Sequence, residues 1–127
     1  GTPDQVLKTN GSGVLSWVAQ SSGGSRPTVT EQNSTATLST PSTSTLEEIY
    51  TVDHTATVTI TLASSSATGE GFKYNIKRLG TGSVVVQCAT NEFIDHTGQA
   101  SFTISARYDS ITLVSNNTSP HSSWLLI

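Results

Sequence analysis

Apolar and polar residues alternate along most of this chain, in short runs that end at Gly, Asn, Asp or Ser. The clearest runs lie between residues 69 and 127, where apolar residues stand two positions apart: Phe72, Tyr74 and Ile76; Val84, Val86 and Cys88; Phe102 and Ile104; Ile111 and Leu113; Trp124 and Leu126. Successive side chains of a strand point to opposite faces, so each set can enter one core. No window in this half has helical spacing. The pattern predicts an antiparallel β domain.

The first residues predict a separate β-hairpin. Residues 5 to 9 and 14 to 18 read as two short strands around Asn10-Gly11-Ser12-Gly13, and Asn-Gly supplies the positive φ angles of a tight turn. An isolated two-stranded hairpin is marginally stable in water, so Val6, Leu15 and Trp17 need a partner surface. We expect residues 1–19 to form this hairpin stub and residues 20–26, QSSGGSR, to form a linker.

Residues 27–127 are expected to form one β-sandwich domain. Strands are predicted at 35–38, 46–54 and 56–63, with Val58, Ile60 and Leu62 on one face, and a loop at 64–71. With the later runs this makes about eight strands, a number that fits a jelly roll. The predicted fold is an all-β, jelly-roll-like antiparallel β-sandwich that follows the hairpin stub.

Composition narrows the classes of partner. A net charge of -3 argues against electrostatic binding to nucleic acid or to an anionic membrane, and the basic Lys73, Lys77 and Arg78 are expected to be a solvated face. No apolar run is long enough for membrane insertion. Cys88 is the single cysteine, which excludes an intrachain disulfide and predicts a small core residue. The two Gly pairs at 69–71 and 80–82 precede no helix and are expected to be turns, so no cofactor is predicted.

Exposed aromatic rings with neighbouring amides and carboxylates are the residues that bind sugars, because a ring stacks on C–H groups while polar side chains take the hydroxyls. Tyr108 with Asp109, and Phe93 with Asn91 and Glu92, are the candidate ligand-binding residues. Core packing explains most of these rings equally well. The loops 64–71, 89–99 and 115–122 are the first places to look for a contact surface.

Two stretches carry a resemblance to a known class. Ile76 and Lys77, a Gly-rich run from Gly80 to Val86, Ile94-Asp95, the run from Tyr108 to Ser115, and Trp124 follow one another in an order that resembles the distal β domains of bacteriophage tail fibres. His96 stands where those domains usually have Gly, so the turn after Asp95 differs. Gly1 to Val18, GTPDQVLKTNGSGVLSWV, is similar to a stub that recurs in phage fibre and tailspike proteins.

The resemblance implies a homotrimer, because such stubs assemble around a threefold axis. It implies a virion location, contacts with other virion proteins on the N-terminal side, and attachment to a host surface glycan or protein. The chain begins with Gly1, so we expect a fragment, a processed product or a tag-cleaved form. On a threefold axis, three copies of one histidine could hold a metal or an anion, and His54 and His96, each preceded by Asp, are the candidates.

The leading functional expectation is therefore a trimeric tail-fibre tip that binds a host glycan without catalysis. The alternative is an assembly subunit, such as a collar, baseplate or capsid-decoration protein, that binds no host ligand. An enzyme is not expected, because the chain is short for a depolymerase β-helix and has no convincing acid pair.

Overall fold

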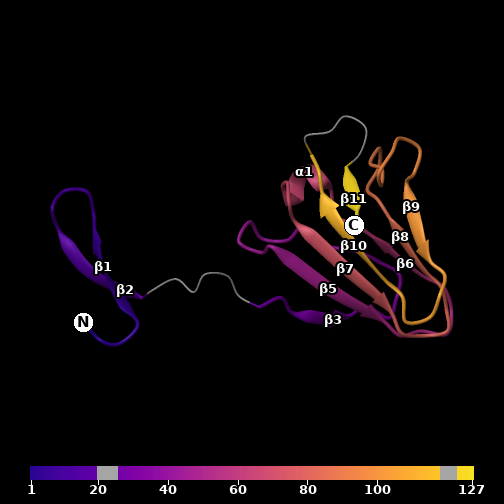
Figure 1. Cartoon of the computed structure of the whole chain (residues 1–127), viewed down its shortest axis with the longest axis horizontal. Coiled ribbons are helices and arrows are strands. Elements are labelled where there is room, and N and C mark those ends of the chain that lie inside the picture. The colour runs from indigo at the N-terminus through magenta and orange to yellow at the C-terminus, as the bar shows by residue number, and fades with distance from the viewer. Residues whose placement is uncertain (20–25, 118–122) are drawn as a thin grey trace.

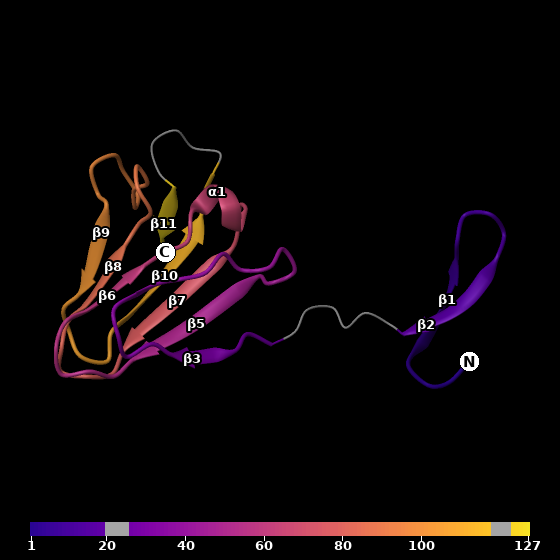
Figure 2. The ribbon, with the colours of Figure 1, turned by 180° about the vertical axis from the view of Figure 1, so that it is seen from behind.

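The computed structural model describes residues 1–19, 26–117 and 123–127. Within them the chain forms a two-stranded sheet of its own near the N-terminus and a sandwich of a five-stranded and a four-stranded sheet (Figures 1 and 2). The predicted all-β sandwich and hairpin stub are confirmed. Apart from its strands the described chain has one short helix, α1 (Ser65–Thr68), and none of its helices has the length and apolar character to span a membrane.

The hairpin consists of β1 (Gln5–Thr9) and β2 (Leu15–Ala19), paired antiparallel. The turn between them contains Gly11 and Gly13, both at positive φ, and the Asn10 side-chain oxygen accepts the Ser12 N–H at 2.8 Å. The sequence therefore predicted this element closely, since its turn chemistry is local.

The sandwich holds nine strands in the described residues. One sheet has the order β11-β10-β7-β5-β3, with β3 (Val29–Glu31), β5 (Glu47–Val52), β7 (Lys73–Arg78), β10 (Ser110–Ser115) and β11 (Trp124–Leu126). The other has the order β4-β6-β8-β9, with β4 (Ala36–Thr37), β6 (Val58–Thr61), β8 (Val84–Gln87) and β9 (Ser101–Ile104). β3 was not predicted, because its three residues are all exposed and give no apolar signal.

From β3 to β8 the chain alternates between the two sheets, and each strand pairs in parallel with the strand two places later. The result is three stacked coils, β3–β4, β5–β6 and β7–β8. A jelly roll consists of antiparallel strands. The expectation of a jelly-roll-like antiparallel sandwich is thus right about the sandwich and wrong about these pairs, since alternation along a strand does not encode the direction of its neighbour.

The later strands close the stack with antiparallel pairs: β9 on β8, β10 on β7 and β11 on β10. Because of these strand directions, the connections between strands lie at two opposite ends of the sandwich. We call the end formed by residues 32–35, 53–57, 79–83 and 105–109 the arch end. We call the end formed by residues 38–46, 62–72 and 88–100, which includes α1, the loop end.

We call the connections within the three coils, residues 32–35, 53–57 and 79–83, the first, second and third arch. Backbone hydrogen bonds join the third arch to the second coil. Gly82 N–H donates to His54 O at 2.9 Å, and Leu79 N–H donates to Val52 O at 2.7 Å. A Cβ at Gly82 would lie 2.0 Å from the Ala56 carbonyl oxygen, so only glycine permits this approach.

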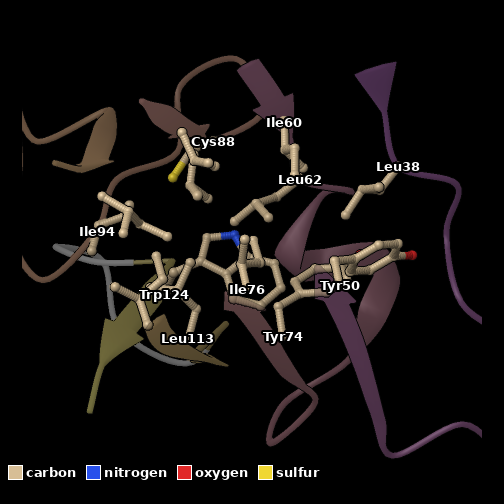
Figure 3. Close-up of a cluster of buried hydrophobic side chains, with 14 of the residues drawn as sticks. Leu38, Tyr50, Ile60, Leu62, Tyr74, Ile76, Cys88, Ile94, Leu113 and Trp124 are labelled. Carbon is tan, nitrogen blue, oxygen red and sulfur yellow. The ribbon is translucent and has the colours of Figure 1, made fainter. Parts of the chain in front are cut away.

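The core lies between the sheets and is built from the inward positions of the alternating runs (Figure 3). Tyr74, Ile76, Leu113 and Trp124 of the five-stranded sheet are fully buried against Ile60, Val84 and Val86 of the four-stranded sheet. The Trp124 and Tyr74 rings pack in a tilted arrangement, with centroids 5.3 Å apart and an angle of 39° between their planes. The predicted periodicity therefore identified the core faces, and Cys88 is a buried core residue as expected.

Arg78 corrects one expectation. Lys73 and Lys77 are exposed, but Arg78 is 6% exposed and does not belong to a solvated face. Its guanidinium donates to the carbonyl oxygens of Gly80, Thr81, Ile104 and Ser105, with 3.1 Å to Gly80. Backbone oxygens satisfy the buried positive charge of Arg78. The same hydrogen bonds join residues 79–83 to the end of β9.

Candidate functional site

The candidate ligand-binding residues do not form one site. Asn91, Glu92 and Phe93 lie at the loop end, in the connection from β8 to β9. Tyr108 and Asp109 lie at the arch end, in the connection from β9 to β10. Because β9 is antiparallel to β8, these two connections leave opposite ends of the sandwich. The two groups must therefore be judged separately.

The loop end carries an open depression of about 710 Å³, which we call the loop groove. Its walls include Asn91 and Phe93 from the predicted set, together with Thr37, Thr61 and Gln87. These last three stand in one row across β4, β6 and β8, since Thr37 pairs with Thr61 and Thr61 with Gln87. Residues paired directly across a sheet share a face, so two hydroxyls and one amide line one side of the groove.

Asn91 and Phe93 line the groove from the connection between β8 and β9. Asn91 is exposed and has a φ of 64°, a left-handed conformation that asparagine adopts more readily than most residues. Phe93 is half-buried, so part of its ring remains accessible. The groove thus joins amides and hydroxyls, which pair with polar ligand groups, to one partly open ring.

Glu92 lines the same groove but is engaged by the protein itself. Its carboxylate accepts the Ser65 N–H at 2.9 Å, the Ser64 hydroxyl at 2.8 Å and the Trp124 indole N–H at 3.2 Å. These donors come from the start of α1 and from β11, two segments distant in sequence. We assign Glu92 a structural role, as the carboxylate that holds the loop end together.

Cys88, which is buried, is also among the residues that line the groove. Burial, with a smaller contribution from Glu92, raises the pKa of Cys88 from 9.0 to about 12. At neutral pH this group is a neutral thiol, and the thiolate is the nucleophilic form. The groove offers hydrogen bonding rather than a sulfur nucleophile.

The arch end presents Tyr108 as an exposed ring. Its φ is 70° and its exposed fraction is 59%. The Arg107 guanidinium carbon lies 4.8 Å from the ring centroid, and the Lys77 ammonium donates to the Tyr108 carbonyl at 2.6 Å. Asp109 is also exposed. Arg107 was not predicted, because nothing in the sequence separates it from an ordinary surface cation.

The two candidate histidines lie at opposite ends, His54 at the arch end and His96 at the loop end. His54 Nδ1 accepts the Ala56 N–H at 3.0 Å, and His96 Nδ1 lies 3.1 Å from the Thr97 carbonyl, where it must donate. No group of three His, Cys, Asp or Glu side chains suited to a metal occurs in the described part of one chain. A site on a threefold axis needs further copies and stays a prediction. Of the loop 115–122, residues 118–122 lie outside the described residues.

Sequence reasoning missed Thr37, Thr61 and Gln87 as groove residues. Each occupies an outward strand position, and only the parallel register of β4, β6 and β8 brings them into one row. Parallel pairing joins residues far apart in sequence, so no local pattern could have found the row.

The site has to be interpreted from its own chemistry. No protein-family model matches the sequence, and a search of curated proteins finds no significant match.

Proposed function

We propose that this chain is the attachment module of a virion appendage, of the tail-fibre tip type, and that it binds a host surface glycan in the loop groove. The observation that carries the proposal is the polar groove of about 710 Å³. Its Thr37, Thr61, Gln87 and Asn91 side chains offer donors and acceptors for sugar hydroxyls, and Phe93 offers a partial ring face. The resemblance of Tyr108 to Ser115 and of the N-terminal stub to phage fibres supports the virion setting.

The proposed mechanism is noncovalent. In the groove the Cys88 thiol is neutral at physiological pH, and the Glu92 carboxylate is taken up by Ser64, Ser65 and Trp124. Binding then depends on hydrogen bonds and ring contact at a shallow surface, which makes each site weak. Several copies on one particle raise the overall avidity by orders of magnitude.

The hairpin supports assembly into a homotrimer. The register of β1 and β2 places Leu7 opposite Trp17 and Thr9 opposite Leu15, so Leu7, Leu15 and Trp17 share one face. Their exposed fractions are 52%, 61% and 53%. A hairpin of two strands cannot bury this face by itself, and copies of the same hairpin are apolar partners of matching shape.

The binding proposal is tested by a glycan array probed with the full chain and with two groove variants, Gln87→Ala and Asn91→Ala. We expect the wild type to bind a defined set of glycans and each variant to lose about tenfold or more of that affinity. Thr103→Ala is the matched control, because Thr103 is exposed on the same sheet outside the groove. Binding that survives both groove variants would refute the groove as the site.

The trimer is tested by light scattering on a sizing column. We expect a particle of about three times the 13.3 kDa chain mass, and a monomer for the variant Trp17→Asp. A wild-type monomer at all concentrations would exclude the trimer and leave an independent sandwich module.

The alternative is an assembly subunit of a collar, baseplate or capsid decoration. Exposed apolar side chains on the sandwich favour it: Val29 is 60% exposed, Leu46 72% and Ile127 70%. Such side chains suit protein contacts more than sugar contacts. An array without hits, together with binding to virion proteins, would select this function over glycan attachment.

A further inference from the structure

The turn at residues 105–109 holds an aromatic residue in an unusual backbone conformation. Four non-glycine residues of the described chain have positive φ: Asp4, Asn91, Asp95 and Tyr108. Asp and Asn are the usual residues there, because their short polar side chains tolerate the left-handed region. Tyr108 has no such advantage, and its conformation costs about 1 kcal/mol or more. Tyr108 is 59% exposed, so packing does not explain why a tyrosine occupies this strained position, and a role in contacting a ligand does.

The surrounding contacts fix this turn. Tyr108 N–H donates to the Arg78 carbonyl at 3.0 Å, and Arg78 N–H donates to the Asp109 carbonyl at 2.9 Å. The Lys77 ammonium also donates to the Tyr108 carbonyl. Arg78 is buried and donates to four carbonyls, so its backbone is held firmly in place. The backbone of Tyr108, which is hydrogen-bonded to Arg78, is therefore well fixed.

Two cations contact Tyr108, and neither has a carboxylate partner in the part of the chain that the structure describes. Arg107 lies over the ring, and its Nε donates to the Leu79 carbonyl at 2.8 Å. Its terminal nitrogens make no hydrogen bond or ion pair within the described residues, and Lys77 has no ion pair there either. In a chain of net charge -3, an exposed guanidinium fixed at one nitrogen and free at its fork is placed to receive an anion.

We infer that the Tyr108 turn, defined as residues 105–109 with Lys77, is a second binding site, and that its ligand is a saccharide carrying a carboxylate. The face of the Tyr108 ring that Arg107 leaves open takes the C–H groups of the sugar. The Arg107 fork takes the carboxylate at the edge of the ring, and the exposed Asp109 carboxylate accepts a sugar hydroxyl. Lys77 adds positive potential beside Arg107. No covalent step is involved.

This site is separate from the loop groove. Residues 105–109 and the groove loop 88–100 leave opposite ends of the sandwich, so one short saccharide cannot contact both. The two sites also differ in charge: Thr37, Thr61, Gln87 and Asn91 of the groove are neutral, whereas the Tyr108 turn carries Arg107 and Lys77, which have no carboxylate partner in the described part of the chain. The neutral wall suits neutral sugars, and the turn selects acidic ones.

The test is a ¹H–¹⁵N NMR titration of the full chain with methyl β-glucuronide and, as the matched neutral probe, methyl β-glucoside. We expect the glucuronide to shift amides of residues 105–109 with weak, saturable binding, and the glucoside to bind there at least about tenfold more weakly. Arg107→Gln should reduce glucuronide affinity about tenfold, while Arg26→Gln, a cation in another region, should leave it unchanged.

Tyr108→Asn removes the ring and keeps a residue that accepts positive φ, so the fold is retained while the ring's contacts with the sugar and with Arg107 are lost. We expect this variant to lose glucuronide binding while the other amide signals stay in place. Equal binding of both glycosides at 105–109, shifts confined to 88–93, or unchanged affinity in Arg107→Gln would overturn the proposal. Binding of glucose 6-phosphate with no response to the glucuronide would also overturn it, because the ligand class would then be a phosphate. Groove amides report in the same spectra, so failure here is distinct from failure of the groove.

Discussion

Two buried tyrosines have opposite polar surroundings. The Tyr50 hydroxyl donates to the Glu48 carboxylate, whereas the Tyr74 hydroxyl is buried with no hydrogen-bond partner among the described residues. Burial is the main cause that raises both pKa values above 10.0. The Tyr50 hydroxyl is therefore hydrogen-bonded, whereas the Tyr74 hydroxyl has no partner among the described residues.

We expect Tyr74→Phe to leave the free energy of unfolding unchanged or to raise it by about 1 kcal/mol, since it removes a buried hydroxyl that lacks a partner. Tyr50→Phe should lower it by about 1 kcal/mol, because Glu48 loses its donor. Urea unfolding followed by circular dichroism measures both. If Tyr74→Phe is the more destabilising of the pair, the hydroxyl has a partner that the described contacts do not include.

The Cys88 thiol should report on alkaline pH. Its pKa in the folded chain, about 12, lies above the ordinary 9.0, so the folded state binds the proton more tightly than the unfolded state. Its contribution to stability is present in full below pH 9 and is lost as pH rises toward 12. The limiting slope is about 1.4 kcal/mol per pH unit.

The measurement compares the free energy of unfolding of wild type and Cys88→Ala between pH 8 and about pH 10, below the range where tyrosine ionisation dominates. We expect the wild type to lose stability faster than the variant above pH 9. Parallel curves would mean that the thiol is not shielded from water.

At the scale of elements, the sequence predicted strands well and their partners poorly. Period-two alternation placed Val58, Ile60 and Val84 on the core face, and all three are buried. The parallel register has its own regularity, because Val52 pairs with Arg78 and Val58 with Val84, each 26 positions apart. The offset of 26 relates the positions of the paired strands but not their residue types, because Arg78 stands opposite the apolar Val52. The pattern of apolar runs therefore did not reveal this repeat.

Glu92 should stabilise the loop end far more than an average surface carboxylate. We expect Glu92→Gln to lower the free energy of unfolding by about 2 kcal/mol, because the buried Trp124 indole and the first turn of α1 lose a charged acceptor. The matched control is Glu31→Gln, at an exposed position of β3, with an expected change within about 0.5 kcal/mol. Equal effects in urea unfolding would contradict the structural role.

The arches predict a strong glycine requirement. Gly82→Ala should lower the free energy of unfolding by about 3 kcal/mol or more, because its Cβ would meet the Ala56 carbonyl oxygen. Thr81→Ala in the same arch removes an exposed side chain and should be nearly neutral. Thermal unfolding of the two variants checks this, and a stable Gly82→Ala protein would show that the arches can separate.

At the scale of the molecule, the sandwich contains the whole buried core, from Leu38 to Trp124. The hairpin contributes no residue to it. We expect a chain of residues 27–127 to fold with the unfolding midpoint of the full chain, and Trp124, which remains its single tryptophan, to report that transition by fluorescence. A loss of the cooperative transition would mean that the hairpin supports the sandwich.

The candidate sites were predictable only in part. Exposed aromatic and amide residues near strand ends pointed to Tyr108 and to the loop with Asn91 and Phe93, and the structure places these at the surface. It separates them to opposite ends, because the β8–β9 hairpin reverses the chain between them. Tertiary contacts bring Thr37, Thr61 and Gln87 into one row and place Arg107 over Tyr108. Such contacts cannot be read from a single sequence.

The constant offset of 26 residues between the second and third coils suggests how this sandwich could grow in evolution. Duplication of a 26-residue segment would add one strand to each sheet and widen the sandwich by about 4.8 Å, the spacing of neighbouring strands. The new coil would offer its neighbours the same hydrogen-bonding edges and the same inward positions. Growth by whole coils would therefore leave the closing strands β9 to β11, and the loops that they carry, free to diversify on their own.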